Sequence, residues 1–217
     1  MEKTWRGVKI PGYTVTEELI NAITHGLGAA FGIVALVLME VKARTALGHV
    51  TAALFGAAMI LTYTMSCVYH ALPARFEGKK ILRVIDHCDV FLLVFGTYIP
   101  AVLIAVGGWL GWTLFGVVAF VTLVGIALSI VDVDKYAAVE VVCHLVNGWS
   151  ILIALPKLLK YSGVIGVFYM ALGGVMYSIG AGLYAVGAKK RYMHCVFHVF
   201  CLLGSMAHFW AIYKYVL

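Results

Sequence analysis

Residues 112–131 read WTLFGVVAFVTLVGIALSIV, and no charged side chain interrupts them. A helix rises about 1.5 Å per residue, so a run of roughly 20 residues spans about 30 Å, the thickness of the hydrocarbon core of a bilayer. In lipid, backbone groups are satisfied only within helices or closed barrels, and this run is too long for a barrel strand. The stretch therefore predicts a transmembrane helix.

The remainder of the chain repeats this pattern. Its 217 residues are 63% hydrophobic and 12% charged, with a mean hydropathy of +0.99, which leaves too few charges to cover a water-facing surface. We expect an all-α, polytopic membrane protein in which residues 1–18, without the apolar core of a signal peptide, precede a seven-helix transmembrane domain over 19–217. The predicted spans, bounded by charges, Gly and Pro, are 19–40, 48–70, 84–105, 112–131, 137–156, 164–187 and 194–216.

The distribution of Lys and Arg predicts the orientation, because cytoplasmic loops of membrane proteins are enriched in these residues. With a cytoplasmic N-terminus, eleven of the 16 cations lie on the inner side and five on the outer side, which favours this orientation with the C-terminus outside. The inner set is Lys3, Arg6, Lys9, Arg75, Lys79, Lys80, Arg83, Lys135, Lys189, Lys190 and Arg191, and the outer set is Lys42, Arg44, Lys157, Lys160 and Lys214. Residues 72–83 are expected to form the longest soluble connection, and no basic patch indicates nucleic-acid binding.

Polar residues from four predicted helices converge at one depth in this topology, near the cytoplasmic face. Ionisable side chains inside a membrane are costly and usually mark a functional site. The outer ends of the helices carry far fewer of them. The converging residues are Glu18, Asn21 and His25 on the first helix, Ser66 and His70 on the second, Asp86, His87 and Asp89 on the third, and His194 and His198 on the seventh.

His194 and His198 are four residues apart, so both rings point to one side of a helix and can offer nitrogens to one metal ion. Taken alone, such a pair is often accidental, and its rings then face the lipid headgroups. His70 at the same depth supplies a third imidazole, and three imidazoles with one open position form the ligand set of a catalytic zinc. We therefore predict a zinc ion, Zn2+, bound by His70, His194 and His198.

Other residues at this depth are assigned roles around that ion. Zinc lowers the pKa of a bound water to roughly 7, and Asp86 is predicted to accept the proton of that water and deliver it to a leaving group. Ser66, one turn before His70, is predicted to hydrogen-bond the water or a substrate oxygen.

Two readings remain open for the residues that surround these. Glu18, Asn21 and His25 either orient the zinc ligands or form a hydrogen-bond network between helices. His87 is expected to be structural or to face headgroups. Glu140 and His144, four residues apart, are expected to pair with each other or to line a substrate or proton path.

The motifs resemble those of the bacterial hemolysin III family, within the superfamily of progestin and adipoQ receptors that includes the adiponectin receptors. They cover nearly the whole chain in order. The motifs are Glu18-x-x-Asn21-x-x-Thr24-His25, Ser66-x-x-x-His70, Asp86-His87, Gly96-Thr97-Tyr98-x-Pro100, His194-x-x-x-His198 and His208-Phe209.

This resemblance implies a seven-helix fold with zinc near the cytoplasmic side, bound at His70, His194 and His198, with Ser66 and Asp86 at the positions of the family's motif Ser and Asp. It also implies ceramidase-like hydrolysis of lipid amides, as linked to eukaryotic relatives, and a place in the bacterial inner membrane. The chain departs from the common bacterial pattern at Asp89, where a small residue is usual. A second acid one turn from Asp86 would disfavour ionisation of Asp86, which bears on its role as a base.

Three functions follow as hypotheses. The first is a zinc-dependent hydrolase of lipid amide or ester bonds, with a membrane lipid as substrate and a role in lipid homeostasis. The second is a non-enzymatic sensor of the membrane state, in which zinc is structural. The third is a pore-forming hemolysin, against which stand seven hydrophobic helices without a cleavable signal.

Overall fold

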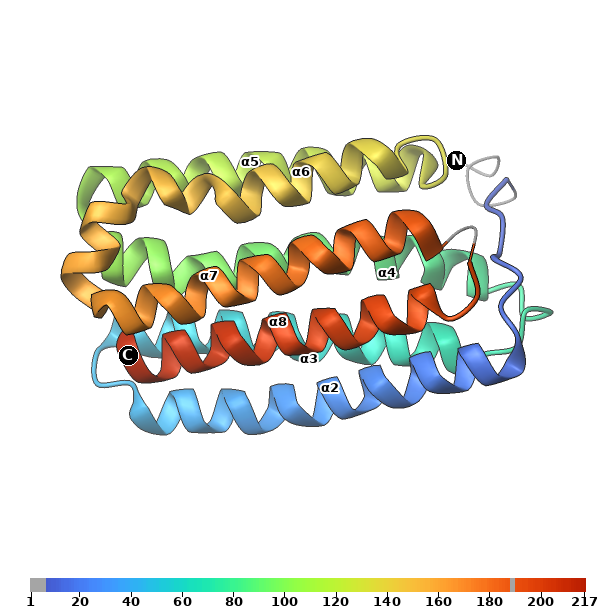
Figure 1. Ribbon diagram of the computed structural model, residues 1–217, viewed down its shortest axis with the longest axis horizontal. Coiled ribbons are helices and arrows are strands. Elements are labelled where there is room, and N and C mark those ends of the chain that lie inside the picture. Colours follow the sequence, from blue (N-terminus) through green and yellow to red (C-terminus); the bar gives the residue numbers. More distant parts are fainter. Residues whose placement is uncertain (1–6, 188–189) are drawn as a thin grey trace.

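The computed structural model describes residues 7–187 and 190–217, apart from the side chain of Val186, and the described chain is a bundle of long helices (Figure 1). Six of its stretches are long and apolar enough to cross a membrane, so the protein is a multi-pass membrane protein. The elements are α2 (Val15–Lys42), α3 (Ala46–Ala71), α4 (Lys79–Pro100), the π-helical turn η1 (Ala101–Val106), α5 (Gly108–Asp132), α6 (Ala137–Ser150), the 3-10 turn η2 (Ile151–Ala154), α7 (Leu155–Gly187) and α8 (Met193–Tyr215).

One of the six stretches, Ala137–Ala185, is much longer than a single crossing requires. Its 49 residues would extend about 74 Å as one straight helix, more than twice the hydrocarbon thickness. The stretch is broken at Gly163, whose φ of 66° and ψ of 175° are not helical. Figure 1 shows the chain reversing in this region, so that α6 and the long part of α7 run in opposite directions.

Helices α2 and α4 are among those that begin earlier than the apolar pattern predicts. Helix α2 begins at Val15 instead of residue 19 because Thr14 and Glu17 form a capping box, with Glu17 N donating to Thr14 Oγ1 at 3.3 Å and Thr14 N donating to Glu17 Oε2 at 2.9 Å. Helix α4 begins at Lys79 instead of residue 84. The connection expected over residues 72–83 is therefore shorter in the structure. The first turns of α4 carry Lys79, Lys80 and Arg83, and because of these charges the apolar run begins only after the helix itself has begun.

The middle of the bundle is held by aromatic and hydroxyl groups. Tyr63 of α3 is fully buried, and its hydroxyl lies 2.6 Å from Ser205 Oγ of α8, which lies 2.7 Å from the hydroxyl of Tyr177 in α7. Gly28 of α2 permits close packing here, since a Cβ atom at that position would lie 2.7 Å from the ring of Tyr63. These contacts fix α3, α7 and α8 relative to one another.

The starts of α2, α4 and α8 and the end of α3 gather at one end of the bundle, on the right in Figure 1. The C-terminus lies at the opposite end. Side chains at these four helix ends are therefore brought together although they are far apart in the sequence.

Candidate metal centre

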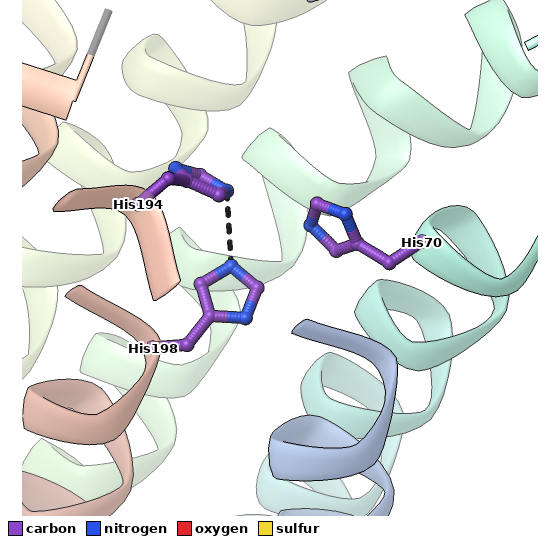
Figure 2. A group of neighbouring side chains, drawn as sticks. All are labelled: His70, His194 and His198. Atoms are coloured by element: carbon purple, nitrogen blue, oxygen red, sulfur yellow. Dashed lines mark hydrogen bonds between the residues drawn. The ribbon is translucent and has the colours of Figure 1, made fainter. Parts of the chain in front are cut away.

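Three buried imidazoles meet at this end of the bundle. His70 lies in the last turn of α3, and His194 and His198 lie in the first turns of α8, with exposed fractions of 2%, 8% and 1%. One ligand atom from each of the three lies within 4.8 Å of the others. Figure 2 shows the three rings facing a common space, with His198 Nε2 3.0 Å from His194 Nε2.

The start of α8 is tied to the start of α2. Tyr192, which precedes α8, adopts the left-handed conformation with φ 63°, and its backbone N–H donates to Glu17 Oε1 at 2.8 Å. Cys195 Sγ lies 3.7 Å from the carbonyl oxygen of Glu17. These contacts place the first turn of α8, and with it His194, against α2.

The ring of His70 is oriented by Glu18. Glu18 Oε2 lies 2.6 Å from His70 Nδ1, and an ionised carboxylate only accepts hydrogen bonds, so Nδ1 carries the proton. The lone pair is then on Nε2. That atom is buried and has no hydrogen-bond partner among the described residues. A histidine whose outer nitrogen donates to a carboxylate while its inner nitrogen stays free is the usual arrangement of a metal ligand.

Two further predicted residues also reach this cluster. Asn21 Nδ2 lies 3.4 Å from His70 Nδ1. The His25 ring stacks on the ring of His198, with a centroid distance of 3.7 Å and an interplanar angle of 15°. Neither ring nitrogen of His25 has a hydrogen-bond partner within the described part of the chain. The structure thus brings Glu18, Asn21 and His25 into contact with the rings of the triad.

The donor set fits a zinc ion in kind and in spacing. Zinc binds imidazole nitrogens at 2.0–2.1 Å in tetrahedral geometry, which places two ligand nitrogens about 3.3 Å apart. The nitrogens of His194 and His198 are 3.0 Å apart, and the three candidate ligand atoms all lie within 4.8 Å of one another. The unpartnered Nε2 of His70 adds a buried polar atom that needs a partner.

A cavity of about 190 Å³ begins beside the triad. Ser66, Asp86, His194 and His198 line it at this end, and it continues between α3, α4, α6, α7 and α8 past mostly apolar side chains. Ser66 Oγ is buried and lacks a hydrogen-bond partner among the described residues, and Asp86 is half-buried. A polar end and an apolar continuation suit an amphipathic molecule.

Asp89 is placed differently from Asp86. It is buried, and it is not among the described residues that line the cavity. Its backbone carbonyl accepts a hydrogen bond from Thr62 Oγ1 at 2.8 Å.

A second carboxylate–histidine pair lies on the cavity wall, which His87, Glu140 and His144 all line. His87 Nδ1 lies 3.0 Å from Glu140 Oε2, so of its two expected readings the structure agrees with the structural one, and the ring faces α6. Glu140 does not pair with His144, because its other oxygen accepts from Ser129 Oγ at 2.8 Å and His144 stacks on Phe91 at 3.8 Å. The spacing of Glu140 and His144 placed both on one side of α6 correctly, but the partners on α4 and α5 hold them apart.

Two residues beside the histidine cluster were missed from the sequence. Lys79 is fully buried, and its Nζ lies 2.6 Å from Glu18 Oε1, although the charge count treated it as a loop cation. The Tyr13 ring stacks on His194, with centroids 4.9 Å apart and an angle of 19°. Burial, together with nearby Tyr184, raises the pKa of the Tyr13 phenol well above its ordinary value, so it stays neutral at physiological pH. No periodic pattern marks either residue.

The segment that carries Tyr13 is anchored on both sides. The backbone N–H of Lys9 donates to Asp134 Oδ2 at 3.2 Å, and Arg83 Nη2 holds the other oxygen of Asp134 at 2.8 Å. Val8 packs with Val84 and Val133. These contacts hold Tyr13 over the triad.

Comparisons with known proteins agree over nearly the whole chain. A family model described as haemolysin-III related matches residues 13–209. Hemolysin-3 of Bacillus cereus is 34% identical over 206 residues, covering 94% of this chain and 93% of that protein. The Hemolysin-3 homolog of Bacillus subtilis (strain 168) is 35% identical over 206 residues, covering 94% and 96%. Human monocyte to macrophage differentiation factor is 22% identical over 218 residues, covering 94% and 86%.

Proposed function

The chain belongs to the haemolysin-III-related family, and on that premise we propose that it is a zinc-dependent hydrolase of lipid amide or ester bonds. It acts from the cytoplasmic leaflet of the bacterial inner membrane and serves lipid homeostasis. The observation that carries the proposal is the position of three buried, converging imidazoles at the polar end of an apolar cavity. The wider relation to the progestin and adipoQ receptors is part of this proposal, since the animal relatives match at 22% identity.

The proposed topology has seven crossings with the N-terminus in the cytoplasm. The break at Gly163 divides a stretch of 49 residues into two runs, each long enough to cross. The described N-terminal segment and the C-terminus lie at opposite ends of the bundle, as an odd number of crossings requires (Figure 1). Of the cations counted on the inner side, Lys3, Arg6 and Lys189 lie outside the described residues.

His70, His194 and His198 hold the ion in this proposal. Bound zinc supplies Lewis acidity, which polarises a carbonyl group and acidifies water. Glu18 holds the His70 ring, and the stacked ring of His25 holds that of His198. A bound Zn2+ would also bring positive charge there, which would stabilise negative charge developing on a substrate oxygen.

Asp86 and Ser66 contribute from the cavity wall. Asp86 accepts a proton from the attacking water and delivers it to the departing amine or alcohol, as a general base and then a general acid. The Ser66 hydroxyl donates a hydrogen bond to the carbonyl oxygen. The apolar walls bind the acyl chain and keep bulk water from the reacting bond.

Metal analysis of the purified protein tests the proposal. The wild type should hold one zinc, and the variant with His70, His194 and His198 all changed to Ala should hold none. The Asp86→Asn variant should keep its zinc and lose turnover, seen as accumulation of one lipid class in cells. A wild type without stoichiometric zinc, or zinc that survives the triple change, contradicts it.

A structural zinc in a non-enzymatic membrane sensor is the second candidate. The observation that favours it is the stacking of Tyr13 on His194, which covers the triad from the side of the N-terminal segment. Under this candidate the Asp86→Ala variant keeps both its zinc and its cellular phenotype. Loss of the phenotype with retained zinc favours the hydrolase.

A further inference from the structure

Lys79 is a fully buried lysine with every donor direction occupied. Its Nζ lies 2.6 Å from Glu18 Oε1 and 2.6 Å from the carbonyl oxygen of Leu72, and it stands over the ring of Tyr69, 5.0 Å from the centroid. An ammonium group has three N–H donors, and here two meet oxygens and the third side faces an aromatic ring. The side chain therefore joins the starts of α2 and α4 to the end of α3.

The carboxylate that Lys79 holds is the one that orients His70. Glu18 Oε1 meets Lys79 at 2.6 Å, and Glu18 Oε2 meets His70 Nδ1 at 2.6 Å. The Glu18 side chain is 18% exposed, whereas those of Lys79 and His70 are 1% and 0% exposed. Without the ammonium group, a glutamate with this access to water is free to rotate away from the imidazole.

We propose that Lys79 is a positioning residue of the metal centre, acting through Glu18 to hold the His70 ring with Nε2 towards His194 and His198. This inference rests on the proposed zinc site and names a residue that neither touches the metal nor belongs to the histidine set. It also ties the turn after α3 to the ligand, because Leu72 and Glu18 share the same ammonium group.

A structural role alone makes a different prediction. If Lys79 merely joins helix ends, its loss lowers the stability of the protein and leaves the metal affinity of the folded fraction unchanged. If it acts through Glu18, its loss lowers the metal affinity, and this loss disappears once Glu18 no longer holds the ring. A double-mutant cycle separates the two, because residues in one network have non-additive effects.

The experiment measures zinc dissociation constants of the full chain in detergent by competition with a chromophoric chelator. The variants are Lys79→Met, Glu18→Gln and the double variant. Changes in residues that orient metal ligands weaken binding by roughly 10- to 100-fold, and we expect this for each single variant. The double variant should be no weaker than Glu18→Gln alone. Lys80→Met is the matched control, since Lys80 has no contact with Glu18 among the described residues, and it should bind zinc as the wild type does.

Cobalt binding gives a second measurement, which stays unchanged if Lys79 has only a structural role. The visible absorption of the cobalt-loaded protein reports the ligand geometry, and Lys79→Met should shift it while Lys80→Met should not. If Lys79→Met does not fold, Lys79→Gln replaces it, because its amide still donates to one of the two oxygens. An intermediate loss of affinity is then expected.

The outcomes distinguish this inference from the proposed function. A wild type that binds no zinc, or binds it without the three histidines, overturns both. If zinc binds through the histidines and Lys79→Met binds it with wild-type affinity, only the role of Lys79 is overturned. The same holds if the losses of affinity in the double variant are additive. A lower melting temperature of metal-free Lys79→Met with wild-type zinc affinity and cobalt spectrum also overturns it.

Discussion

Two glutamate–histidine pairs lie at the same end of the bundle, each with one partly buried member, and they differ in what holds the second carboxylate oxygen. In the first, Glu18 meets His70 at 2.6 Å and Lys79 at 2.6 Å. In the second, Glu140 meets His87 at 3.0 Å and Ser129 Oγ at 2.8 Å. One carboxylate thus has a cationic partner besides its histidine, and the other has a neutral hydroxyl.

Under the proposed zinc site, this difference separates a metal ligand from a packing contact. Lys79 gives Glu18 a cationic partner in addition to His70. Ser129 gives Glu140 a neutral hydroxyl as its second partner. The rings also have different neighbours: His70 faces His194 and His198, whereas His87 has the ring of Tyr184 at 6.0 Å.

Removing one histidine from each pair gives the largest expected contrast. His70→Ala should weaken zinc binding at least about 100-fold, because a three-nitrogen set loses a ligand. His87→Ala should leave zinc binding unchanged. Metal content after dialysis against a weak chelator measures both, and zinc loss in His87→Ala would remove the distinction between the pairs.

Removing the charge of each glutamate sharpens the comparison. Glu18→Gln should weaken zinc binding by roughly 10- to 100-fold, because the ring of His70 loses its charged acceptor. Glu140→Gln should bind zinc normally and unfold more easily, by about 1–3 kcal/mol, because a buried hydrogen-bond partner of His87 is lost. Chelator competition and thermal unfolding in detergent read the two effects, and equal zinc affinities in the two variants would contradict this prediction.

Removing the hydroxyl of Ser129, the second partner of Glu140, should have a smaller effect. Ser129 is fully buried, and its Oγ also lies 3.0 Å from the carbonyl oxygen of Gly125, so its single proton is shared between that oxygen and Glu140. Ser129→Ala should lower the free energy of unfolding by about 1 kcal/mol, the contribution of one hydrogen bond, with zinc affinity unchanged. Unfolding curves of the metal-free and zinc-loaded protein should shift by the same amount. A larger shift in the zinc-loaded form would tie this pair to the metal.

The smallest expected effect is at the ring that covers His194. Tyr13→Ala removes an aromatic contact that is worth about 0.5–1.5 kcal/mol, so zinc should be released a few-fold faster. Tyr13→Phe keeps the stacking and should release zinc at the wild-type rate. Stopped-flow mixing with excess chelator measures the rates. Equal rates in Tyr13→Ala and the wild type would show that the ring does not cover the site.

The apolar spans could be predicted because a bilayer demands long uncharged helices, and the polar residues at one depth followed from the charge count. The burial of Lys79 could not be predicted, because it depends on Glu18, a residue that is distant in the sequence. The pairing of Glu140 with His144 was a wrong expectation for a related reason. Spacing along one helix determines which way a side chain points, but neighbouring helices determine what it meets.

The Tyr63–Ser205–Tyr177 hydroxyl chain has a consequence for how the protein responds to bilayers of different thickness. Sliding α3, α7 or α8 by one turn would leave buried hydroxyls without partners, at about 1–3 kcal/mol each. When the apolar length of a helix differs from the thickness of the bilayer, the helix can tilt, which costs fractions of a kcal/mol per ångström of mismatch. The three helices therefore tilt together as one block, and the spacing of the histidines at their ends is insulated from the thickness of the surrounding lipid.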